Sequence, residues 1–439
     1  MNTGPDIAVV GGGYAGFAAA VTLARGGARV TLFESSRVLG GRARVIDKYG
    51  CRIDNGQHIL LGAYTETLRL LRLVGVKPSV LETRKLALVY PGECTLRAAA
   101  LPAPLHLAVG LLRATGLDWQ DKLAMARLMR SLKRRKFRIE PDRPVAELLA
   151  ETAQTERLTR LIWEPLCVAA LNTPVVDASA QVFANVLRDS LAAGASASDL
   201  LLPRLDLSEL FPVPASRWLA MRGHTVRIAE PIKAIESIGE GYRLDGDPWT
   251  TLFEHVVIAT APYHVAPLVE TLPAMAPVVE GIAALRYEPI VTAWLAFDGP
   301  VSFPEPKIGL SGGYGQWAFD RAALGGEEGL VSVVISARGA HQEVSKEALE
   351  IALLQELQHV LGPLPTLSWS QIITEKRATF SCTPGLVRPG VATPQPGLWL
   401  AGDYIASDYP ATIESAIRSG VQAGRSILKR CGLKEQILS

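Results

Sequence analysis

The stretch Ile7-Ala-Val-Val-Gly-Gly-Gly-Tyr-Ala-Gly16 decides the fold expected of this 439-residue chain. Its apolar beginning predicts a buried strand, and the small residues of Phe17–Arg25 predict the helix that follows. Gly11 permits a tight turn between the two, Gly13 lets the backbone approach a pyrophosphate, and Gly16 lets the helix pack closely on the strand. The pattern therefore predicts a Rossmann-type α/β domain with a dinucleotide at the helix N-terminus.

A carboxylate at the end of the next predicted strand supports this interpretation. Glu34 closes the run Val30-Thr-Leu-Phe-Glu34, eighteen residues after Gly16. At that spacing a carboxylate accepts hydrogen bonds from ribose hydroxyls, and its charge repels a 2′-phosphate. The alternative interpretation of Glu34 is a solvated charge at a strand end.

The composition is typical of a globular protein with two domains, given the length of the chain. Hydrophobic residues make up 48% of the sequence, and 45 Lys and Arg against 43 Asp and Glu leave a formal charge of +2. So small a charge provides no field for nucleic acid, and no nucleic-acid motif is present. The five cysteines form no C-x-x-C pair and the seven histidines lack metal-ligand spacing, so we predict neither a redox dithiol nor a metal site.

The sequence predicts a cytoplasmic protein. Met1-Asn-Thr-Gly-Pro5 runs almost directly into the first predicted strand, which argues against a secretory signal. No uninterrupted apolar run reaches the ~18 residues that a membrane-spanning helix needs. The scattered cysteines are typical of reduced cytosolic thiols.

Two further segments favour FAD over NAD as the dinucleotide. In Arg37-Val-Leu-Gly-Gly-Arg42, Gly41 and its neighbour let the chain pass close to the cofactor, and Arg42 can direct its guanidinium at a phosphate or at the adenine side. The alternative is an ordinary surface turn. Leu398-Trp-Leu-Ala-Gly402-Asp403 predicts a short buried strand, and Asp403 is suited to hold ribityl hydroxyls, which only a flavin has.

A helix near the C-terminus provides a further predicted contact with the flavin. Pro410-Ala-Thr-Ile-Glu-Ser-Ala-Ile-Arg-Ser-Gly420 predicts a helix that starts at Pro410. The N–H groups near Ile413 would point at the pyrimidine edge of the isoalloxazine, where the helix dipole favours the negative charge of reduced flavin. We therefore expect FAD to bind between the two ends of the chain.

A second dinucleotide fingerprint is missing from the sequence. Gly312-Gly-Tyr-Gly315 is the nearest pattern, but it does not open a helix with the required third glycine, so we predict a turn there. Without a domain for NAD(P)H, the electrons must come from, or go to, an external partner.

With these segments in hand, the chain resembles the FAD-dependent amine oxidase and phytoene desaturase superfamily and, within it, the hydroxysqualene dehydroxylase family. The resemblance runs from Gly11 to Gly420, and Leu171-Asn-Thr-Pro174 carries the narrower assignment. The segments that match are Ile53-Asp-Asn-Gly-Gln-His58, Trp163-Glu-Pro-Leu-Cys-Val-Ala-Ala-Leu-Asn-Thr-Pro174, Ala178-Ser-Ala180, Val186-Leu-Arg-Asp-Ser190, Tyr409-Pro-Ala-Thr-Ile-Glu414 and Arg418-Ser-Gly420.

The resemblance implies an enzyme that reduces the allylic C30 alcohol hydroxysqualene to squalene, in bacterial squalene and hopanoid synthesis. It also implies a backbone contact of Ile232 with adenine, and contacts from the turn after the Asp54 strand with the isoalloxazine. Together with the residues argued above, the predicted cofactor contacts are Gly11, Gly13, Ala15, Gly16, Glu34, Gly41, Arg42, Gly56, Gln57, His58, Ile232, Gly402, Asp403 and Ile413.

Loss of water from such a substrate needs a proton donor, an apolar cavity and a hydride. His58 is our first candidate for the catalytic donor, because its strand and turn run toward the isoalloxazine in related folds. A hydrogen bond to backbone near the flavin is the alternative role of His58. Glu164 and Asp408 are the reserve candidates.

Two other functions stay open. A carotenoid- or phytoene-type desaturase would use the same cofactor in the reverse electron direction on a similar polyisoprene. A prenyl-chain carrier like Rab-GDI would use the same fold without catalysis. Glu34, Arg42 and Asp403 argue against the carrier, because a carrier has no need to keep contacts with FAD.

The predicted domains interleave along the chain. The FAD-binding domain takes residues 1–90, 221–284 and 385–439, and an α+β substrate domain takes residues 91–220 and 285–384. Inside the substrate domain we predict a helix capped by Asp118, with Leu123, Ala126, Leu128 and Leu132 at helical spacing, strands over Val291–Phe297 and Leu330–Ser336, and a helix from about Lys346 to Val360.

One part of the substrate domain has two interpretations. Leu101-Pro-Ala-Pro-Leu-His-Leu-Ala-Val-Gly-Leu-Leu-Arg113 is apolar but too short to span a bilayer, Trp119 follows, and Lys133-Arg-Arg-Lys136 is basic. Together they are typical of a surface in peripheral contact with the anionic inner face of a cell membrane. A core helix beside a solvated basic face explains them equally well.

Overall fold

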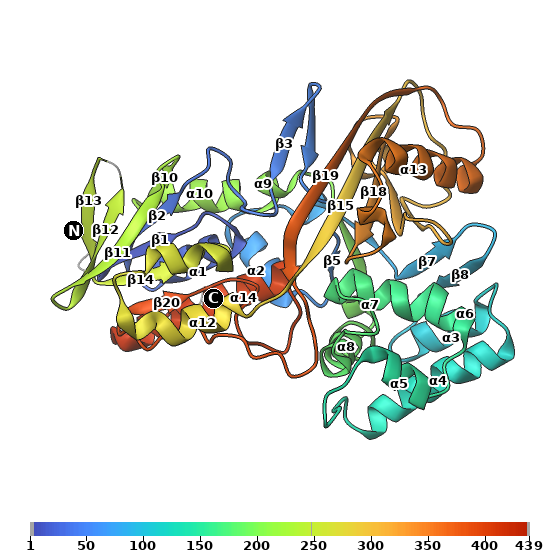
Figure 1. Cartoon of the computed structure of the whole chain (residues 1–439), viewed down its shortest axis with the longest axis horizontal. Helices are drawn as coiled ribbons and strands as arrows, with labels where there is room; N and C mark the ends of the chain where they lie inside the picture. Colours follow the sequence, from blue (N-terminus) through green and yellow to red (C-terminus); the bar gives the residue numbers. More distant parts are fainter. Residues whose placement is uncertain (1–3, 247, 437–439) are drawn as a thin grey trace.

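A fully parallel sheet forms the first body of the protein (Figure 1). The computed structural model describes residues 4–246 and 248–436, and Met1–Thr3 of the N-terminal segment lie outside the described residues. Neighbouring strands pair in parallel throughout, which confirms the Rossmann-type α/β class. In spatial order the strands are β10 (Thr225–Ile228), β2 (Arg29–Glu34), β1 (Asp6–Val10), β14 (His255–Ile258) and β20 (Leu398–Leu400).

The first and last long helices of this body, α1 (Tyr14–Arg25) and α14 (Ile413–Arg430), lie side by side. Glycines permit the close approach: a Cβ on Gly420 would lie 2.1 Å from the carbonyl oxygen of Ala15, and one on Gly424 would lie 2.9 Å from the Thr22 side chain. The two ends of the chain therefore fold together, as the sequence predicts.

The start of α14 differs from the prediction, because the helix begins at Ile413 and not at Pro410. Thr412 has an extended backbone, with φ of −136° and ψ of 165°, and acts as the N-cap. Its hydroxyl accepts a hydrogen bond from the Ser415 N–H at 3.1 Å, which satisfies one of the free donors of the first turn. A residue with a good cap thus sets the boundary, and Pro410 remains in the preceding loop.

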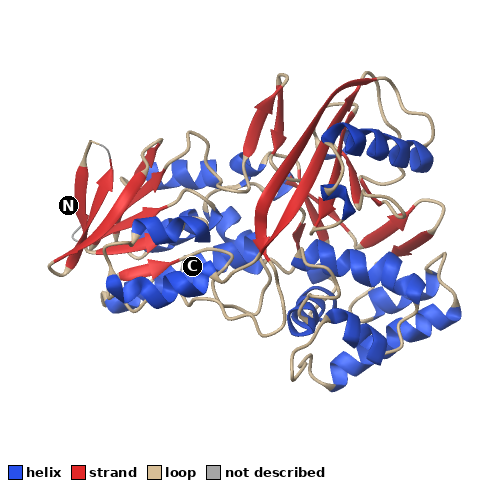
Figure 2. Ribbon diagram, in the orientation of Figure 1, coloured by secondary structure: helices blue, strands red, loops and turns tan. Residues whose placement is uncertain are grey.

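A five-stranded antiparallel sheet forms the centre of the second body (Figure 2). One of its faces packs against α13 (Lys346–Leu361) through a separate apolar core that includes Ala293, Val333 and Leu353. In spatial order the strands are β16 (Lys307–Gly309), β17 (Trp317–Asp320), β18 (Leu330–Ser336), β15 (Tyr287–Phe297) and β19 (Leu367–Phe380). The two predicted strands and the predicted helix of this region are confirmed.

A group of helices completes the second body at the end of the molecule farthest from β11 (Ile232–Ile238) (Figure 1). Asp118 caps α4 as predicted, since its carboxylate accepts from the Asp121 N–H at 2.9 Å. The predicted apolar face of α4 is partly wrong: Leu128 and Leu132 are buried, but Leu123 is 64% exposed. The helices are α3 (Leu105–Arg113), α4 (Trp119–Arg134), α5 (Val145–Glu151), α6 (Glu156–Leu158), α7 (Glu164–Leu171) and α8 (Ala180–Leu187).

The remaining strands and helices are short, and none of the helices in the described ranges is long and apolar enough to cross a membrane. The strands are β3 (Val45–Lys48), β4 (Cys51–Asp54), β5 (Leu60–Leu61), β6 (Leu81–Arg84), β7 (Ala87–Tyr90), β8 (Cys94–Arg97), β9 (Leu200–Pro203), β11 (Ile232–Ile238), β12 (Gly241–Gly246) and β13 (Thr250–Phe253). The helices are α2 (Thr65–Leu73), α9 (Leu207–Leu210), α10 (Pro212–Ala220), α11 (Val265–Leu268) and α12 (Ala276–Ala283).

The contact of α1 with α14 predicts the effect of a single methyl group. Gly420→Ala would place a carbon 2.1 Å from the Ala15 oxygen, so the helices must separate and the free energy of unfolding should fall by about 1–3 kcal/mol. Gly281→Ala in α12 is the matched control, since a Cβ there meets nothing within 4 Å. Thermal unfolding measures both, and equal melting temperatures for the two variants would contradict the close contact.

Candidate active site

The fingerprint glycines form an open cradle at the start of α1. Gly11 has φ of +119°, and a Cβ on Gly16 would lie 1.9 Å from the Gly11 oxygen, so both positions require glycine. A Cβ on Gly13 would meet nothing closer than 3.8 Å, which leaves space beside the backbone. Gly13 caps α1 without a side-chain acceptor, so the first-turn N–H groups, including that of Ala15, suit an anion.

Glu34 lies fixed beside this cradle. Its two carboxylate oxygens accept from the Gly12 N–H at 2.6 Å and the Ser36 N–H at 2.7 Å. The Glu34 carbonyl also accepts from the Glu230 N–H at 3.0 Å, which brings the start of β11 and its first residue, Ile232, close to the end of β2. The structure therefore brings Glu34 and the Ile232 segment to the same edge of the sheet.

The second glycine loop meets the first. The Gly40 N–H donates to the Gly12 oxygen at 2.9 Å, and Gly41 adopts φ of +63°. The Arg42 guanidinium then reaches the opposite end of the chain, where it donates to the Ala378 oxygen at 2.6 Å and to the Asp403 carboxylate at 2.5 Å. The sequence predicts a phosphate or adenine contact for Arg42 and does not anticipate this ion pair.

The pair with Asp403 keeps Arg42 charged. Burial lowers the pKa of the Arg42 guanidinium, but the Asp403 carboxylate beside it outweighs burial and leaves that pKa above its ordinary value. Gly402 precedes Asp403 with φ of +159°, and its N–H donates to the Ser419 hydroxyl of α14 at 2.8 Å. Two predicted flavin contacts, Gly402 and Asp403, are thus held between the α1 loop region and α14.

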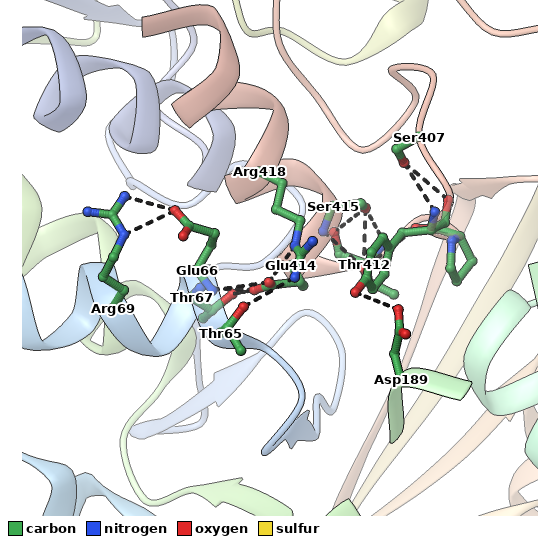
Figure 3. A network of polar contacts seen from close by, with 12 residues as sticks. Thr65, Glu66, Thr67, Arg69, Asp189, Ser407, Thr412, Glu414, Ser415 and Arg418 are labelled. Atoms are coloured by element: carbon green, nitrogen blue, oxygen red, sulfur yellow. Dashed lines mark hydrogen bonds and ion pairs between the residues drawn. The ribbon is translucent and has the colours of Figure 1, made fainter. Parts of the chain in front are cut away.

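A polar network anchors the N-terminus of α14, where Ile413 is the first residue (Figure 3). The Glu414 carboxylate is fully buried and accepts from the Thr67 N–H at 2.9 Å, the Thr67 hydroxyl at 2.6 Å and the Glu66 N–H at 3.1 Å. Arg418, one turn later, donates to the same carboxylate at 2.6 Å. Glu414 therefore caps α2 and fixes the position of the helix end that Ile413 opens.

The turn Asn55–His58 after β4 brings three predicted contacts together. The His58 Nδ1 lies 3.0 Å from the Gly56 oxygen, which accepts only, so Nδ1 carries the proton in the neutral ring. The side-chain amide oxygen of Gln57 accepts from the hydroxyl of Ser332 and a guanidinium N–H of Arg321, both at 3.3 Å. This turn therefore lies against the antiparallel sheet.

The surroundings of His58 favour its neutral form. Burial is the main cause that lowers the pKa of His58, and the charge of Arg42 lowers it further, against the effect of the bond to Gly56. The structure thus supports the backbone hydrogen bond that was the alternative role of His58. Glu164 and Asp408, the reserve candidates, both have exposed side chains and lack the enclosure that a proton donor for water loss needs.

A row of side chains that the sequence does not predict lies on the sheet face opposite α13. Lys307, Phe319, Ser332 and Trp294 are successive cross-strand partners in β16, β17, β18 and β15, so they point to one side. That side faces the Asn55–His58 turn, because the Ser332 hydroxyl donates to Gln57 and the Trp294 ring N–H donates to the backbone carbonyl oxygen of Asp54 at 3.1 Å. Lys307 lies about 10 Å from Ser332, two strand spacings away.

Lys307 is a buried cation that lies against an aromatic ring. Its Nζ is 3.9 Å from the centre of the Trp317 ring, and no carboxylate among the described residues pairs with it. Burial alone lowers the pKa of Lys307 to about 7. A lone lysine in a three-residue strand gives no sequence signal for burial, which explains why it was missed.

Three buried hydroxyls support the fit of a polar cofactor. Thr260, Thr292 and Tyr404 have side-chain oxygens without a hydrogen-bond partner among the described residues. Each lies beside a predicted contact: the Thr260 backbone near Gly11, Thr292 near Gly56, and Tyr404 directly after Asp403. Buried polar groups normally have partners, so this arrangement suits a ligand with many hydrogen-bonding atoms, as FAD has.

Asn172 of the Leu171-Asn-Thr-Pro174 stretch joins the helical group to the sheet. It ends α7 in a left-handed conformation, with φ of +47°. Its side-chain amide donates to the Thr379 hydroxyl at 2.9 Å and the Pro289 oxygen at 3.2 Å, and its oxygen accepts from the Ala337 N–H at 2.6 Å. The segment that carries the narrower resemblance therefore connects the helical group to the antiparallel sheet through hydrogen bonds.

The fold and site define a flavin enzyme. Residues 14–428 match the family model described as flavin containing amine oxidoreductase, and the chain belongs to this family. A putrescine oxidase structure with bound putrescine has the same fold, with a TM-score of 0.71 over 97% of this chain and 99% of that one at 17% identity. The protein is an FAD-dependent oxidoreductase, and the prenyl-chain carrier is the weaker alternative.

Particular relatives within the family confirm the resemblance recognised in the sequence. The chain is 30% identical to a hydroxysqualene dehydroxylase of Rhodopseudomonas palustris, over 96% of this chain and 97% of the relative. It is 25% identical to a zeta-carotene desaturase of Synechocystis, over 96% of this chain and 97% of that one. The carotenoid desaturases fit less well than the dehydroxylases.

Asp54, beside the site, makes stability depend on pH. Burial raises the pKa of its carboxyl to about 7, against the effects of the Leu207 N–H and the Arg321 charge. Between about pH 4, where an unfolded Asp ionises, and pH 7, the folded state holds one more proton than the unfolded state. This group's contribution to the free energy of unfolding is therefore present below pH 4 and falls as pH rises to 7.

Asp54→Asn should remove this fall, so its stability relative to the unmodified protein should improve steadily from pH 4 to pH 7. Urea unfolding at pH 4, 5.5 and 7 measures the difference. Asp408→Asn is the control, because its side chain is exposed. A constant difference between Asp54→Asn and the unmodified protein across this range would show that Asp54 ionises normally in the folded state.

Proposed function

We propose that this protein reduces hydroxysqualene to squalene, in bacterial synthesis of squalene and hopanoids. The full-length similarity to the Rhodopseudomonas palustris hydroxysqualene dehydroxylase is the observation that carries the proposal. An external reductant would supply the electrons, because the chain has one dinucleotide fingerprint. The proposal includes peripheral contact with the inner face of the cell membrane, where a C30 hydrocarbon partitions.

The residues that would hold FAD extend from the edge of the parallel sheet near Glu34 to the Asn55–His58 turn, which meets the antiparallel sheet. The α1 cradle of Gly11, Gly13, Ala15 and Gly16 would bind the pyrophosphate, with Glu34 on the adenosine ribose and Ile232 beside the adenine. Gly41, Arg42, Gly402 and Asp403 would surround the ribityl chain, and Gly56, Gln57, His58 and Ile413 the isoalloxazine. When bound and reduced, FAD supplies a hydride to the allylic carbon.

Release of the hydroxyl group as water needs a proton, and we propose Lys307 as its source. The ammonium group lies on the sheet face that meets the Asn55–His58 turn, away from carboxylates and in contact with Trp317. Its proton is easily lost, since burial lowers the pKa of Lys307 to about 7. His58, neutral and with Nδ1 donating to Gly56, would accept a hydrogen bond from the substrate hydroxyl at Nε2 and so position it.

The assignment of the donor predicts a pH profile. Lys307→Met should lower the single-turnover rate of squalene formation by about 10²-fold or more and remove the decrease in rate expected as pH rises through about 7. His58→Gln should keep that decrease, and Lys376→Met, an exposed lysine of β19, is the matched control. If His58→Gln removes the decrease while Lys307→Met keeps it, the donor is His58.

Product analysis tests the function itself and separates it from carotenoid desaturation. Protein with FAD reduced under anaerobic conditions should convert hydroxysqualene to squalene, detected by gas chromatography. The oxidised protein should leave phytoene unchanged in the presence of a quinone, because the proposed reaction runs in the opposite electron direction. Desaturation of phytoene without conversion of hydroxysqualene would overturn the proposal.

A further inference from the structure

Exposed apolar side chains concentrate on one short part of the chain. Of the fourteen large apolar side chains that are exposed among the described residues, five lie within residues 101–123. Four of them, Leu105, Leu112, Trp119 and Leu123, are more than half exposed. All five residues of Leu101-Pro-Ala-Pro-Leu105 are exposed, so the segment that leads into α3 presents apolar side chains to solvent. Clusters of this kind mark interaction surfaces.

The helix α3 is not a core helix. Only His106 and Gly110 of its nine residues are buried. Gly110 packs so closely on β8 that a Cβ there would lie 2.4 Å from the Arg97 oxygen, which fixes the helix on the body of the protein. Leu105, Ala108 and Leu112 recur at spacings of three and four on its exposed side. The core-helix interpretation of this segment is therefore wrong.

The helix α4 continues the same surface and adds positive charge. Trp119, Leu123, Arg127, Arg130 and Arg134 follow at spacings of three and four, and all five are exposed. The Lys122 ammonium lies 5.3 Å from the centre of the Trp119 ring and donates to the Leu112 oxygen at 2.9 Å, so it ties the two helices together. We call this face, with the Leu101–Leu105 loop, the α3–α4 surface.

The charge of this region is unlike that of the rest of the protein. Residues 101–139 contain nine Lys and Arg and two Asp, a formal charge of +7, whereas the whole chain has +2. One of the two acids, Asp121, is buried and caps α4 together with Asp118. Positive potential therefore stands beside exposed apolar side chains on a single face.

We infer that the α3–α4 surface docks on a lipid membrane that contains anionic lipid. The apolar side chains of the loop, α3 and the first turns of α4 would enter the interface, while the arginines of α4 meet the headgroups. An anionic bilayer is favoured over a protein partner, because cores of protein interfaces are depleted in charge, whereas lysine and arginine beside apolar groups are typical of interfacial helices. The inference rests on the peripheral membrane contact included in the proposed function and deepens it by naming the surface and the lipid, but it does not require the proposed substrate.

Flotation of the FAD-loaded full chain with vesicles tests the inference. At low salt the protein should float with vesicles of phosphatidylcholine containing 30% phosphatidylglycerol, and at least fivefold less with pure phosphatidylcholine or in 0.5 M salt. The double variants Trp119→Ser/Leu123→Ser and Arg127→Glu/Arg130→Glu should each reduce the floating fraction at least fivefold. These side chains are exposed, so FAD content and melting temperature should stay unchanged.

Matched controls change the same residue types elsewhere on the surface. Met221→Ser/Val387→Ser alters exposed apolar residues, and Arg72→Glu/Lys77→Glu alters exposed cations; both should float like the unmodified protein. Failure of the unmodified protein to float, or equal losses in the control variants, would overturn the inference. If the unmodified protein proves to be a dimer and the Trp119→Ser/Leu123→Ser variant a monomer, the surface is a contact between copies and the inference is overturned. Squalene formation is measured separately in detergent micelles. Loss of membrane binding can therefore be told apart from failure of the proposed reaction.

Discussion

The close packing of α1 on α14 is the constraint on which the site depends. Gly420 and Gly424 have no side chains, and any larger residue at these positions would hold the helices apart. The fingerprint loop at one end of the chain can then meet the Gly402–Asp403 segment at the other. The ion pair of Arg42 with Asp403 joins residues that are 361 positions apart, which the packing of these helices and the pairing of β14 with β20 bring together. Burial of the pair is tolerated since both charges have partners.

The antiparallel sheet uses its two faces for different purposes. Alternate residues of its strands point to opposite sides, so one set packs with α13 and the other faces the flavin-binding body. Asn172 holds the helical group to the ends of these strands through its hydrogen bonds to Pro289, Ala337 and Thr379. The position of the sheet over the Asn55–His58 turn therefore depends on the hydrogen bonds of Asn172 as well as on apolar packing.

Burial of the titratable groups determines their charge states in the site. Burial lowers the pKa of His58 and of Lys307 and raises the pKa of Asp54, so each of these groups moves toward its neutral form. Arg42 stays charged because Asp403 pairs with it. A site in which burial disfavours the charged forms of these groups, and in which Asp403 compensates the charge of Arg42, is suited to chemistry on an apolar chain, in which charge develops at the reacting atoms.

The sequence by itself determined the nucleotide-binding end, the α/β class and the family resemblance. These depend on local patterns: the spacing of Gly11, Gly13 and Gly16, the position of Glu34, and the apolar runs of strands such as β18, whose predicted bounds match the structure. Adjacent residues suffice to specify a tight turn, a helix N-terminus or a buried strand, so this information is readable without the fold.

Only the tertiary structure decided which distant groups meet. The partner of Arg42, the exposure of Leu123 and the burial of Lys307 all depend on which face of one element packs against another. Charge and hydrophobicity in the sequence indicate the opposite for two of these residues, since an apolar Leu123 is expected inside and a charged Lys307 outside. Long-range packing overrides these local preferences, because a side chain's environment is set by elements that are remote in the chain.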